Sequence, residues 1–298
     1  MIVVDWGTSS FRAFRIAANG TILDRRSAPR GIMHVEGGRF AETLRNEIGD
    51  WLTAGESRVL LSGMIGSRQG WKEAPYVPCP AGATELGAAL VDVPFDGAQG
   101  NVQVKLVPGM NGVDACGVAE VMRGEETQII GALAVIGSNG LACLPGTHSK
   151  WVRVENGRIA RFTSHMTGEA FGALRDHTIL GRMMKDGAPS DAAFDAGIGR
   201  ANEPGGLLHH LFGVRTQTLF GKLAEADGAS YLSGLLIGHE LRAELVGAQG
   251  ETVHLIGAPE LVALYARAIA ACGAKTVSHD ADASVRGLII IGEHARWQ

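Results

Sequence analysis

Residues 5–12 read Asp-Trp-Gly-Thr-Ser-Ser-Phe-Arg, and residues 144–151 read Leu-Pro-Gly-Thr-His-Ser-Lys-Trp. Each stretch follows a short apolar run that predicts a buried strand, at residues 2–5 and 141–144. The turn in each stretch is rich in glycine and hydroxyl residues and leads into a second predicted strand. Glycine lets backbone N–H groups approach phosphate oxygens, and Thr and Ser hydroxyls add further donors. The two stretches therefore predict two phosphate-binding hairpins.

The residues around these hairpins predict the same arrangement twice in the chain. An Asn-Gly pair follows the second strand each time, at residues 19–20 and 156–157, and predicts a hairpin turn into a third strand. Residues 63–83 predict a long loop that mixes glycine, proline and aromatic residues, and such loops are often functional. Further strands are predicted at 21–28, 58–62, 102–107, 158–163, 252–256 and 276–278. Helices are predicted at 40–52, 125–136, 169–184, 191–200, 207–211, 229–246 and 259–272, with a last helix that starts near residues 280–282.

Length and composition limit the class of protein. The 298 residues suit two domains, which we expect at 1–107 and 108–298 with a boundary near Pro108. The net charge of −4 and the lack of a basic run argue against a nucleic-acid partner. No apolar run reaches the length of a membrane span, and no signal peptide is visible. Four cysteines without C-x-x-C spacing fit a reducing compartment, so we expect a cytoplasmic protein.

A third segment, Ile-Gly-Ala-Pro-Glu-Leu at residues 256–261, carries a further binding signal. A predicted strand ends in Gly257 and Ala258, and Pro259 suits the first position of a helix. Two small residues at this point would let an adenine or ribose lie against the backbone. A generic strand-to-helix turn would look the same.

The order of these three segments is similar to that of the actin, hexokinase and Hsp70 ATPase superfamily. Residues 62–71 (SGMIGSRQGW), 121–128 (VMRGEETQ) and 144–151 (LPGTHSKW) resemble segments of the 2-dehydro-3-deoxygalactonokinases. The resemblance implies an α/β fold of the actin-like ATPase (ribonuclease H-like) class, with two domains around a cleft for nucleotide and sugar. It also implies transfer of the ATP γ-phosphoryl group to the C6 hydroxyl of 2-dehydro-3-deoxy-D-galactonate.

The residues that we expect to bind ATP lie in the three segments. Asp5 is the expected ligand of Mg²⁺, because that ion prefers oxygen ligands. The expected ATP-binding residues are Gly7, Thr8, Ser9, Ser10, Arg12, Gly146, Thr147, His148, Ser149, Lys150, Gly257 and Ala258.

The resemblance implies that a carboxylate ahead of the second phosphate turn is the catalytic base. Glu125 and Glu126 both follow Gly124, where related sugar kinases usually have Asp. Asp114 is a third candidate, and Asp5 belongs to the catalytic group through the metal. A Glu-Glu pair at a helix start is also favourable for the helix dipole alone.

A sugar acid calls for an arginine, whose planar guanidinium group can bind a carboxylate through two hydrogen bonds. Arg68 and Arg123 lie in the family-like segments. The expected substrate-binding residues are Met64, Arg68, Trp71, Arg123 and Glu169.

Two other functions remain open at this point. A non-catalytic sugar sensor of this fold usually carries an additional DNA-binding segment, and the chain starts at its first strand. A phosphatase of the same superfamily would share the phosphate turns without needing the loop at residues 63–71. We expect a sugar acid and ATP as small-molecule partners, no membrane partner, and a homodimer as one possible assembly.

Overall fold

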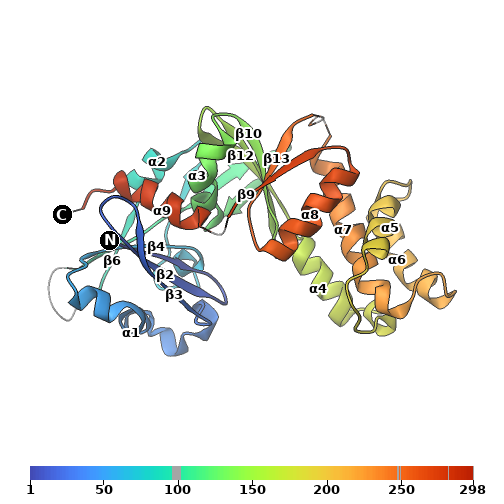
Figure 1. Cartoon of the computed structure of the whole chain (residues 1–298), viewed down its shortest axis with the longest axis horizontal. Helices are drawn as coiled ribbons and strands as arrows, with labels where there is room; N and C mark the ends of the chain where they lie inside the picture. The colour runs from blue at the N-terminus through green and yellow to red at the C-terminus, as the bar shows by residue number, and fades with distance from the viewer. Residues whose placement is uncertain (96–101, 247, 249, 281, 298) are drawn as a thin grey trace. The chain divides into compact units, whose positions relative to one another are not determined.

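The computed structural model describes residues 1–95, 102–246, 248, 250–280 and 282–297 (Figure 1). Contacts divide the chain into two compact units. Unit 1 comprises Met1–Gly140, Val152–Thr163 and Asp280–Gln298, and unit 2 comprises Leu141–Trp151 and Ser164–His279. The predicted boundary between residues 107 and 108 falls inside unit 1 and stays a prediction.

The first sheet contains the predicted N-terminal meander. Its strand order is β3-β2-β1-β4-β7-β6. Strand β1 pairs with β2 in antiparallel and with β4 in parallel orientation, and β4 pairs in parallel with β7. The strands are β1 (Ile2–Trp6), β2 (Phe11–Ile16), β3 (Ile22–Ala28), β4 (Arg58–Ser62), β6 (Val91–Val93) and β7 (Gln103–Leu106).

The second sheet repeats this topology, as the sequence predicted. Its order β12-β11-β10-β13-β14 corresponds to β3-β2-β1-β4-β7. The turn between β11 and β12 has positive φ at Asn156 (53°) and Gly157 (70°), the backbone that an Asn-Gly hairpin favours. The strands are β10 (Gly140–Leu144), β11 (Ser149–Glu155), β12 (Arg158–His165), β13 (Thr252–Leu255) and β14 (Lys275–Ser278).

A third sheet was missed from the sequence. Strands β5 (Tyr76–Pro78), β8 (Gly109–Val113) and β9 (Ala119–Met122) form it in that order. The sequence of β8, Gly-Met-Asn-Gly-Val, contains three residues that disfavour strands, so its pattern gave no signal. The predicted loop at residues 63–83 supplies β5 and ends where helix α2 (Ala83–Ala88) begins.

Each helix predicted from the sequence is present, two of them with a different length, and the short α2 was not predicted. α4 ends at His177 rather than near residue 184, and α6 runs to Leu219 rather than ending at residue 211. The helices are α1 (Phe40–Thr53), α3 (Glu125–Ile136), α4 (Thr167–His177), α5 (Asp191–Ala201), α6 (Gly206–Leu219), α7 (Gly228–Glu244), α8 (Pro259–Ala271) and α9 (Ala283–Glu293).

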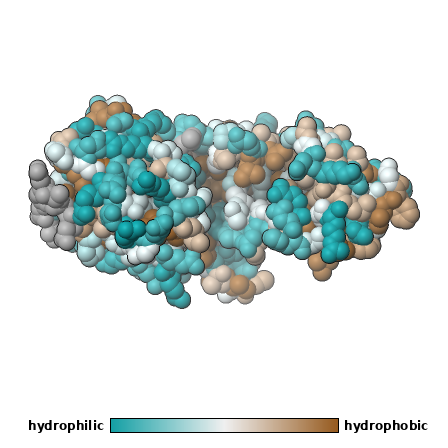
Figure 2. Space-filling model, turned by 90° about the horizontal axis from the view of Figure 1, so that it is seen from below, coloured by the Kyte–Doolittle hydropathy of each residue, from teal (hydrophilic) through white to brown (hydrophobic). Residues whose placement is uncertain are grey.

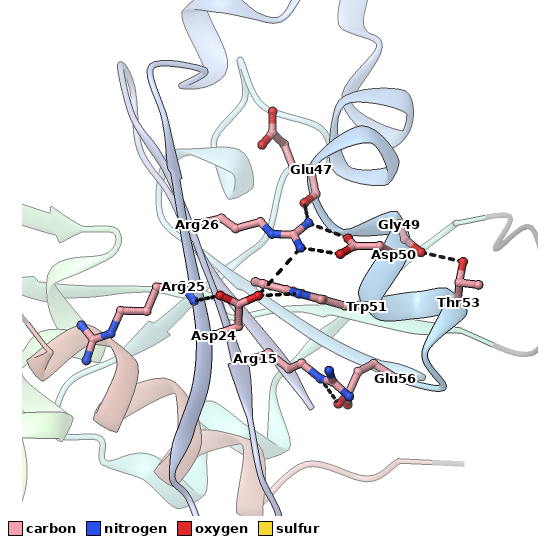
Figure 3. Close-up of polar contacts among 10 residues, drawn as sticks. All are labelled: Arg15, Asp24, Arg25, Arg26, Glu47, Gly49, Asp50, Trp51, Thr53 and Glu56. Atoms are coloured by element: carbon pink, nitrogen blue, oxygen red, sulfur yellow. Dashed lines mark hydrogen bonds and ion pairs between the residues drawn. The ribbon is translucent and has the colours of Figure 1, made fainter.

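Ion pairs and ring contacts fasten α1 to the first sheet (Figure 3). Arg26 on β3 donates to both carboxylate oxygens of Asp50, at 2.6 and 2.5 Å, and its guanidinium group lies 4.1 Å from the ring centroid of Trp51. The Trp51 indole donates to Asp24 at 3.1 Å. A two-point arginine contact and an aromatic face together fix the position of the helix on the strand.

Helices α3 and α9 touch backbone to backbone within unit 1. A Cβ atom at Gly131 would lie 1.8 Å from the carbonyl oxygen of Ala283, and one at Gly287 would lie 1.7 Å from that of Thr127. No real Cβ fits at these distances, so both positions require glycine. The same kind of contact joins α5 and α7 in unit 2, where a Cβ at Gly234 would lie 2.0 Å from the Phe194 carbonyl oxygen.

The surface is mixed in polarity (Figure 2). In unit 2, Leu208, Phe212 and Phe220 are largely exposed on or just after α6.

Among the described residues, no helix combines the length and the apolar composition that a membrane crossing requires.

We predict that Gly287→Ala lowers the free energy of unfolding by about 3 kcal/mol or more, because the added methyl group overlaps the Thr127 carbonyl and forces α9 away from α3. Urea denaturation measures the change. Gly49→Ala in α1 is the matched control, since its Cβ would meet only the Arg45 side chain at 3.9 Å. The control should raise stability by up to about 1 kcal/mol. Equal stability of both variants would show that the helices can separate without loss.

Candidate functional site

In unit 1, the first predicted phosphate turn lies at the carboxyl end of β1. Asp5 is aligned with Ser62 of β4 and with Arg12 of β2. Gly63 is the first residue after β4 and has a φ of 95°. A Cβ at this position would lie 2.8 Å from the Trp6 carbonyl oxygen and 3.4 Å from Asp5 Oδ1. The loop after β4 therefore passes directly beside the Asp5 carboxylate.

The turn itself is supported from behind. Gly7 N–H donates to the Ser10 carbonyl at 2.9 Å, and the side chains of Thr8 and Ser9 are exposed. The backbone N–H of Ile32 donates to the Gly7 carbonyl at 3.0 Å. A Cβ at Gly31 would lie 2.3 Å from Thr8 backbone atoms, so glycine allows this support. The turn thus exposes two hydroxyl side chains on a fixed backbone.

Asp5 has an environment suited to a metal or a proton. Its side chain is 24% exposed, and Arg12 Nη1 lies 4.0 Å from Asp5 Oδ2. Burial raises the pKa of Asp5, and the positive charge of Arg12 acts in the opposite direction.

The predicted catalytic glutamates lie beside the same loop. Gly124 has a φ of 105°, and a Cβ there would lie 3.3 Å from Gly63 Cα. Glu125 Oε2 accepts from Arg123 N–H at 2.9 Å, and Glu126 Oε2 accepts from Gly124 N–H at 2.7 Å. The fold thus brings residues 5, 63 and 124–126 together, although they are far apart in sequence.

The two glutamates differ in environment. Glu126 is fully buried (0% exposed), whereas Glu125 is half-buried. Desolvation, with a smaller contribution from the nearby Glu125 charge, raises the pKa of Glu126 to about 8. Glu126 is therefore largely protonated at neutral pH, which makes it a poor proton acceptor.

Arg123 holds two unused hydrogen-bond donors. Its Nη2 donates to the Ala74 carbonyl at 2.8 Å, and its guanidinium group lies 4.5 Å from the Tyr76 ring centroid. Its Nε and Nη1 atoms are buried without a partner. A Cβ at Gly66 would lie 2.9 Å from Nη1, so Gly66 makes room for this group.

Other unpartnered buried polar atoms lie on the same segments. They are Ser62 Oγ, Ser67 Oγ and Glu126 Oε1. Buried polar groups in folded proteins are normally satisfied, so this concentration around residues 62–67 and 123–126 marks a place for water or a ligand.

The remaining unit 1 candidates lie in less distinctive positions. Arg68 is 88% exposed and pairs with Glu73 at 3.4 Å. Met64 and Trp71 pack partly buried against the core of unit 1. The carboxylate of Asp114 accepts from two backbone N–H groups in the turn between β8 and β9, at 2.8 and 2.9 Å, which is a sufficient structural role.

In unit 2, the second predicted phosphate turn connects β10 and β11. Ser149 is fully buried, and Lys150 is 6% exposed. Within the described part of the chain, the Lys150 ammonium group forms no hydrogen bond or ion pair. A lysine ammonium group that no carboxylate pairs with, next to a turn of this composition, suits an anionic ligand.

Helix α4 begins directly against this turn. A Cβ at Gly168 would lie 2.4 Å from the Gly146 carbonyl oxygen, and Glu169 N–H donates to the Thr147 carbonyl at 3.0 Å. The His148 imidazole hydrogen-bonds to the Glu169 carboxylate. Glu169, predicted to bind the sugar, thus lies at the second phosphate turn.

The predicted adenosine segment contacts the same turn. A Cβ at Gly257 would lie 3.3 Å from the Pro145 carbonyl oxygen. Ala258 has extended backbone angles and is the residue before α8, and Pro259 is at the first helical position.

A cavity of about 570 Å³ lies within unit 2 and was not predicted. It is formed by parts of α4, α5, α7 and α8 together with Gly146, and its lining includes Phe171, Phe194 and Leu261. Its polar lining includes Ser190, Ser233 and Tyr265, together with the charged residues Arg175, Asp176, Lys185, Asp186 and Asp191. A cavity of this size, with apolar side chains and several polar and charged groups, suits a small polar organic ligand such as a nucleoside.

Comparisons with known proteins agree with these features. The 2-keto-3-deoxy-galactonokinase family matches residues 5–291. A protein from Rhizobium meliloti named as a probable 2-dehydro-3-deoxygalactonokinase is 36% identical, covering 99% of this chain and 96% of the relative. The 2-dehydro-3-deoxygalactonokinase of Escherichia coli is 33% identical, covering 99% of this chain and 97% of the relative.

Solved structures give the fold. A crystal structure from Sinorhizobium meliloti, assigned to the 2-dehydro-3-deoxygalactonokinases, has a TM-score of 0.87 and 35% identity over 98% of both chains. The activator of 2-hydroxyisocaproyl-CoA dehydratase from Clostridium difficile has a TM-score of 0.51 at 12% identity, covering 99% of this chain and 95% of that one, and so shows the fold alone.

With the repeated strand order, these matches confirm the predicted actin-like ATPase class. The family match spans nearly the whole chain and includes both phosphate turns, the glutamate pair and the adenosine segment. The chain belongs to the 2-keto-3-deoxy-galactonokinase family.

Proposed function

We propose that the protein transfers the γ-phosphoryl group of ATP to the C6 hydroxyl of 2-dehydro-3-deoxy-D-galactonate. The observation that carries the proposal is the family match over residues 5–291. The products would be ADP and 2-dehydro-3-deoxy-6-phosphogalactonate. The hydroxyl oxygen forms a bond to the γ-phosphorus, the bond from that phosphorus to the β,γ-bridging oxygen breaks, and the hydroxyl proton moves to a carboxylate.

Unit 2 has the features of a nucleotide-binding unit. The 570 Å³ cavity would hold the nucleoside, next to the adenosine segment at Gly257 and Ala258. Gly146 belongs both to the cavity lining and to the second phosphate turn, so the phosphates would extend from the cavity onto residues 146–149. The buried Lys150 would supply positive charge to them.

Unit 1 has the features expected for the metal and the acceptor. Asp5 offers a partly exposed carboxylate beside the first phosphate turn, and one carboxylate with nucleotide phosphates is a usual set of ligands for Mg²⁺. Bound Mg²⁺ would neutralise charge on the phosphates. The exposed Thr8 and Ser9 hydroxyls would donate to phosphate oxygens.

The difference between the glutamates supports distinct roles. Glu125 would accept the C6 hydroxyl proton, because it is half-buried and adjoins the loop beside Asp5. Glu126 is fully buried and bonded to Gly124 N–H, so it would hold the turn in place. The unused donors of Arg123 would bind the substrate carboxylate, and the exposed Arg68 is the weaker candidate.

A non-catalytic sensor and a phosphatase have no observation in their favour. The cytoplasmic location and the homodimer stay predictions.

The first test is ADP release from Mg²⁺-ATP with 2-dehydro-3-deoxygalactonate, with its gluconate epimer, and without sugar. We expect sugar-dependent release that is highest with the galactonate form, and a phosphorylated sugar acid in equal amount. Release without sugar would identify a phosphatase. Absence of release with every sugar, while ATP still binds, would contradict the kinase assignment.

The glutamate roles are tested by Glu125→Gln and Glu126→Gln. Glu125→Gln removes the base and should lower kcat by roughly 10²- to 10⁴-fold, whereas Glu126→Gln should lower kcat far less. Glu126→Gln should instead change the pH dependence of stability. Burial raises the pKa of Glu126 from an ordinary 4.5 to about 8, so the folded state holds the proton that the unfolded state loses between these values.

In wild type, the contribution of Glu126 to the free energy of unfolding is therefore fully present below about pH 4.5. This contribution is lost as the pH rises toward 8, by at most about 1.4 kcal/mol per pH unit. Urea unfolding from pH 5 to 8 should show this decline in wild type and a flatter curve in Glu126→Gln. Glu42→Gln, on an exposed turn of α1, is the control and should follow wild type. Parallel curves for all three proteins would contradict the neutral Glu126.

The arginine roles are tested by Arg123→Lys and Arg68→Ala. Lysine retains the charge but loses the planar donors, so Arg123→Lys should raise the KM for the sugar acid about tenfold or more and leave the KM for ATP near wild type. Arg68→Ala should have the smaller effect, because its side chain is solvated. If Arg68→Ala instead raises the KM for the sugar acid more than Arg123→Lys does, Arg68 is the residue that binds the substrate carboxylate.

A further inference from the structure

Glu240 on α7 is a buried acidic residue to which the proposed mechanism gives no part. It is 3% exposed and receives hydrogen bonds from three side chains. Trp151 Nε1–H donates to its Oε1 at 2.7 Å, Tyr265 O–H donates to its Oε2 at 2.8 Å, and Thr167 Oγ1–H donates to Oε2 as well.

Each donor comes from a different element of the proposed nucleotide site. Trp151 lies on β11, two residues after Ser149 of the second phosphate turn. Thr167 is the first residue of α4 and lines the cavity, and its neighbour Gly168 packs on the Gly146 carbonyl. Tyr265 lies on α8 and also lines the cavity.

Tyr265 is suited to remain a donor. Burial raises its pKa, and the nearby Glu240 charge raises it further, so the phenol keeps its proton. Glu240 itself does not line the cavity and therefore acts only through its partners.

A buried carboxylate is a costly way to fill space. Its desolvation is offset only when hydrogen bonds satisfy its oxygens, and its loss leaves the donors without partners. Charge-assisted hydrogen bonds are also shorter and more directional than neutral ones. Three such bonds from three elements restrict the relative positions of β11, α4 and α8.

We propose that Glu240 is a positioning residue that holds the second phosphate turn, the start of α4 and the cavity-lining face of α8 in the geometry that binds ATP. This inference rests on the proposed function, since it assigns the nucleotide to unit 2. The sugar acid is assigned to residues of unit 1, so a defect at Glu240 should act on the nucleotide selectively.

The test is Glu240→Gln, which keeps the shape but replaces one acceptor oxygen with an NH₂ group. We expect the KM for ATP and the Kd of Mg²⁺-ATP, measured by calorimetry, to rise on the order of tenfold, corresponding to the loss of about one net hydrogen bond. The KM for the sugar acid should change less than twofold. Thermal unfolding of each variant separates this effect from a general loss of stability.

Asp195→Asn is the matched control. Asp195 on α5 also accepts from an α8 side chain, Arg267, at 2.6 Å, but on the exposed side and outside the cavity lining. Its kinetic constants should equal those of wild type. A second variant guards against misfolding of Glu240→Gln: Trp151→Phe keeps an aromatic ring outside the cavity lining but removes the donor to Glu240 Oε1, and it should also weaken ATP binding.

The outcomes separate the two proposals. If wild type binds ATP normally and Glu240→Gln leaves its affinity unchanged, or raises both KM values equally along with a lower Tm, Glu240 has only a structural role and this inference is wrong. If wild type itself binds no ATP, the proposed function fails, and the inference fails with it.

Discussion

The positions of Glu125 and Glu126 in unit 1 depend on how closely the backbones of two helices approach each other. α3 begins with Glu125 and Glu126, and its position is set where Gly131 and Gly287 let it touch α9 without intervening side chains. Because backbone atoms are far less adjustable than side chains, such a contact fixes distance and rotation together. At its other end, Gly124 touches Gly63 beside Asp5. The four glycines, which have no side chain to hold the backbones apart, thus set where the acidic groups lie.

Unit 2 combines the same device with a polar one. α5 and α7 meet through Gly197 and Gly234, which brings two helices of the cavity wall into backbone contact. From the opposite end of α7, Glu240 and Glu244 receive hydrogen bonds from residues of the second sheet and from Thr167, the first residue of α4. Close packing sets the wall of the cavity, and the buried Glu240 carboxylate ties together the elements beside it.

Local signals in the sequence predicted much of this molecule. Short apolar runs and the Asn-Gly pairs were sufficient for both meanders, because such signals act within a few residues. The third sheet escaped because β8 contains two glycines and an asparagine. α4 was predicted too long: a Cβ at Gly181 would lie 1.6 Å from the Arg175 carbonyl, so the chain folds back after His177, a contact that periodicity does not report.

The site was predicted in part for the same reason. Phosphate turns are continuous stretches, so their residues could be named from the sequence. The cavity is assembled from four helices and the segment at residues 181–190, and no single stretch contains its pattern. The contrast between Glu125 and Glu126 depends on burial by distant residues and could not be seen in two adjacent identical letters.

The discontinuity of unit 1 has a consequence for how the chain is made. Its sheet is formed by residues 2–106, yet α9, at residues 283–293, supplies the surface against which α3 packs. Contacts between residues so far apart in sequence form late, because a long intervening segment must first be ordered. During translation unit 1 therefore stays incomplete until the C-terminal helix α9 has been made. Unit 2 has all its residues once residue 279 has emerged. On this basis unit 2 would complete its fold first on the ribosome, and the acidic groups of α3 would be the last to be fixed in place.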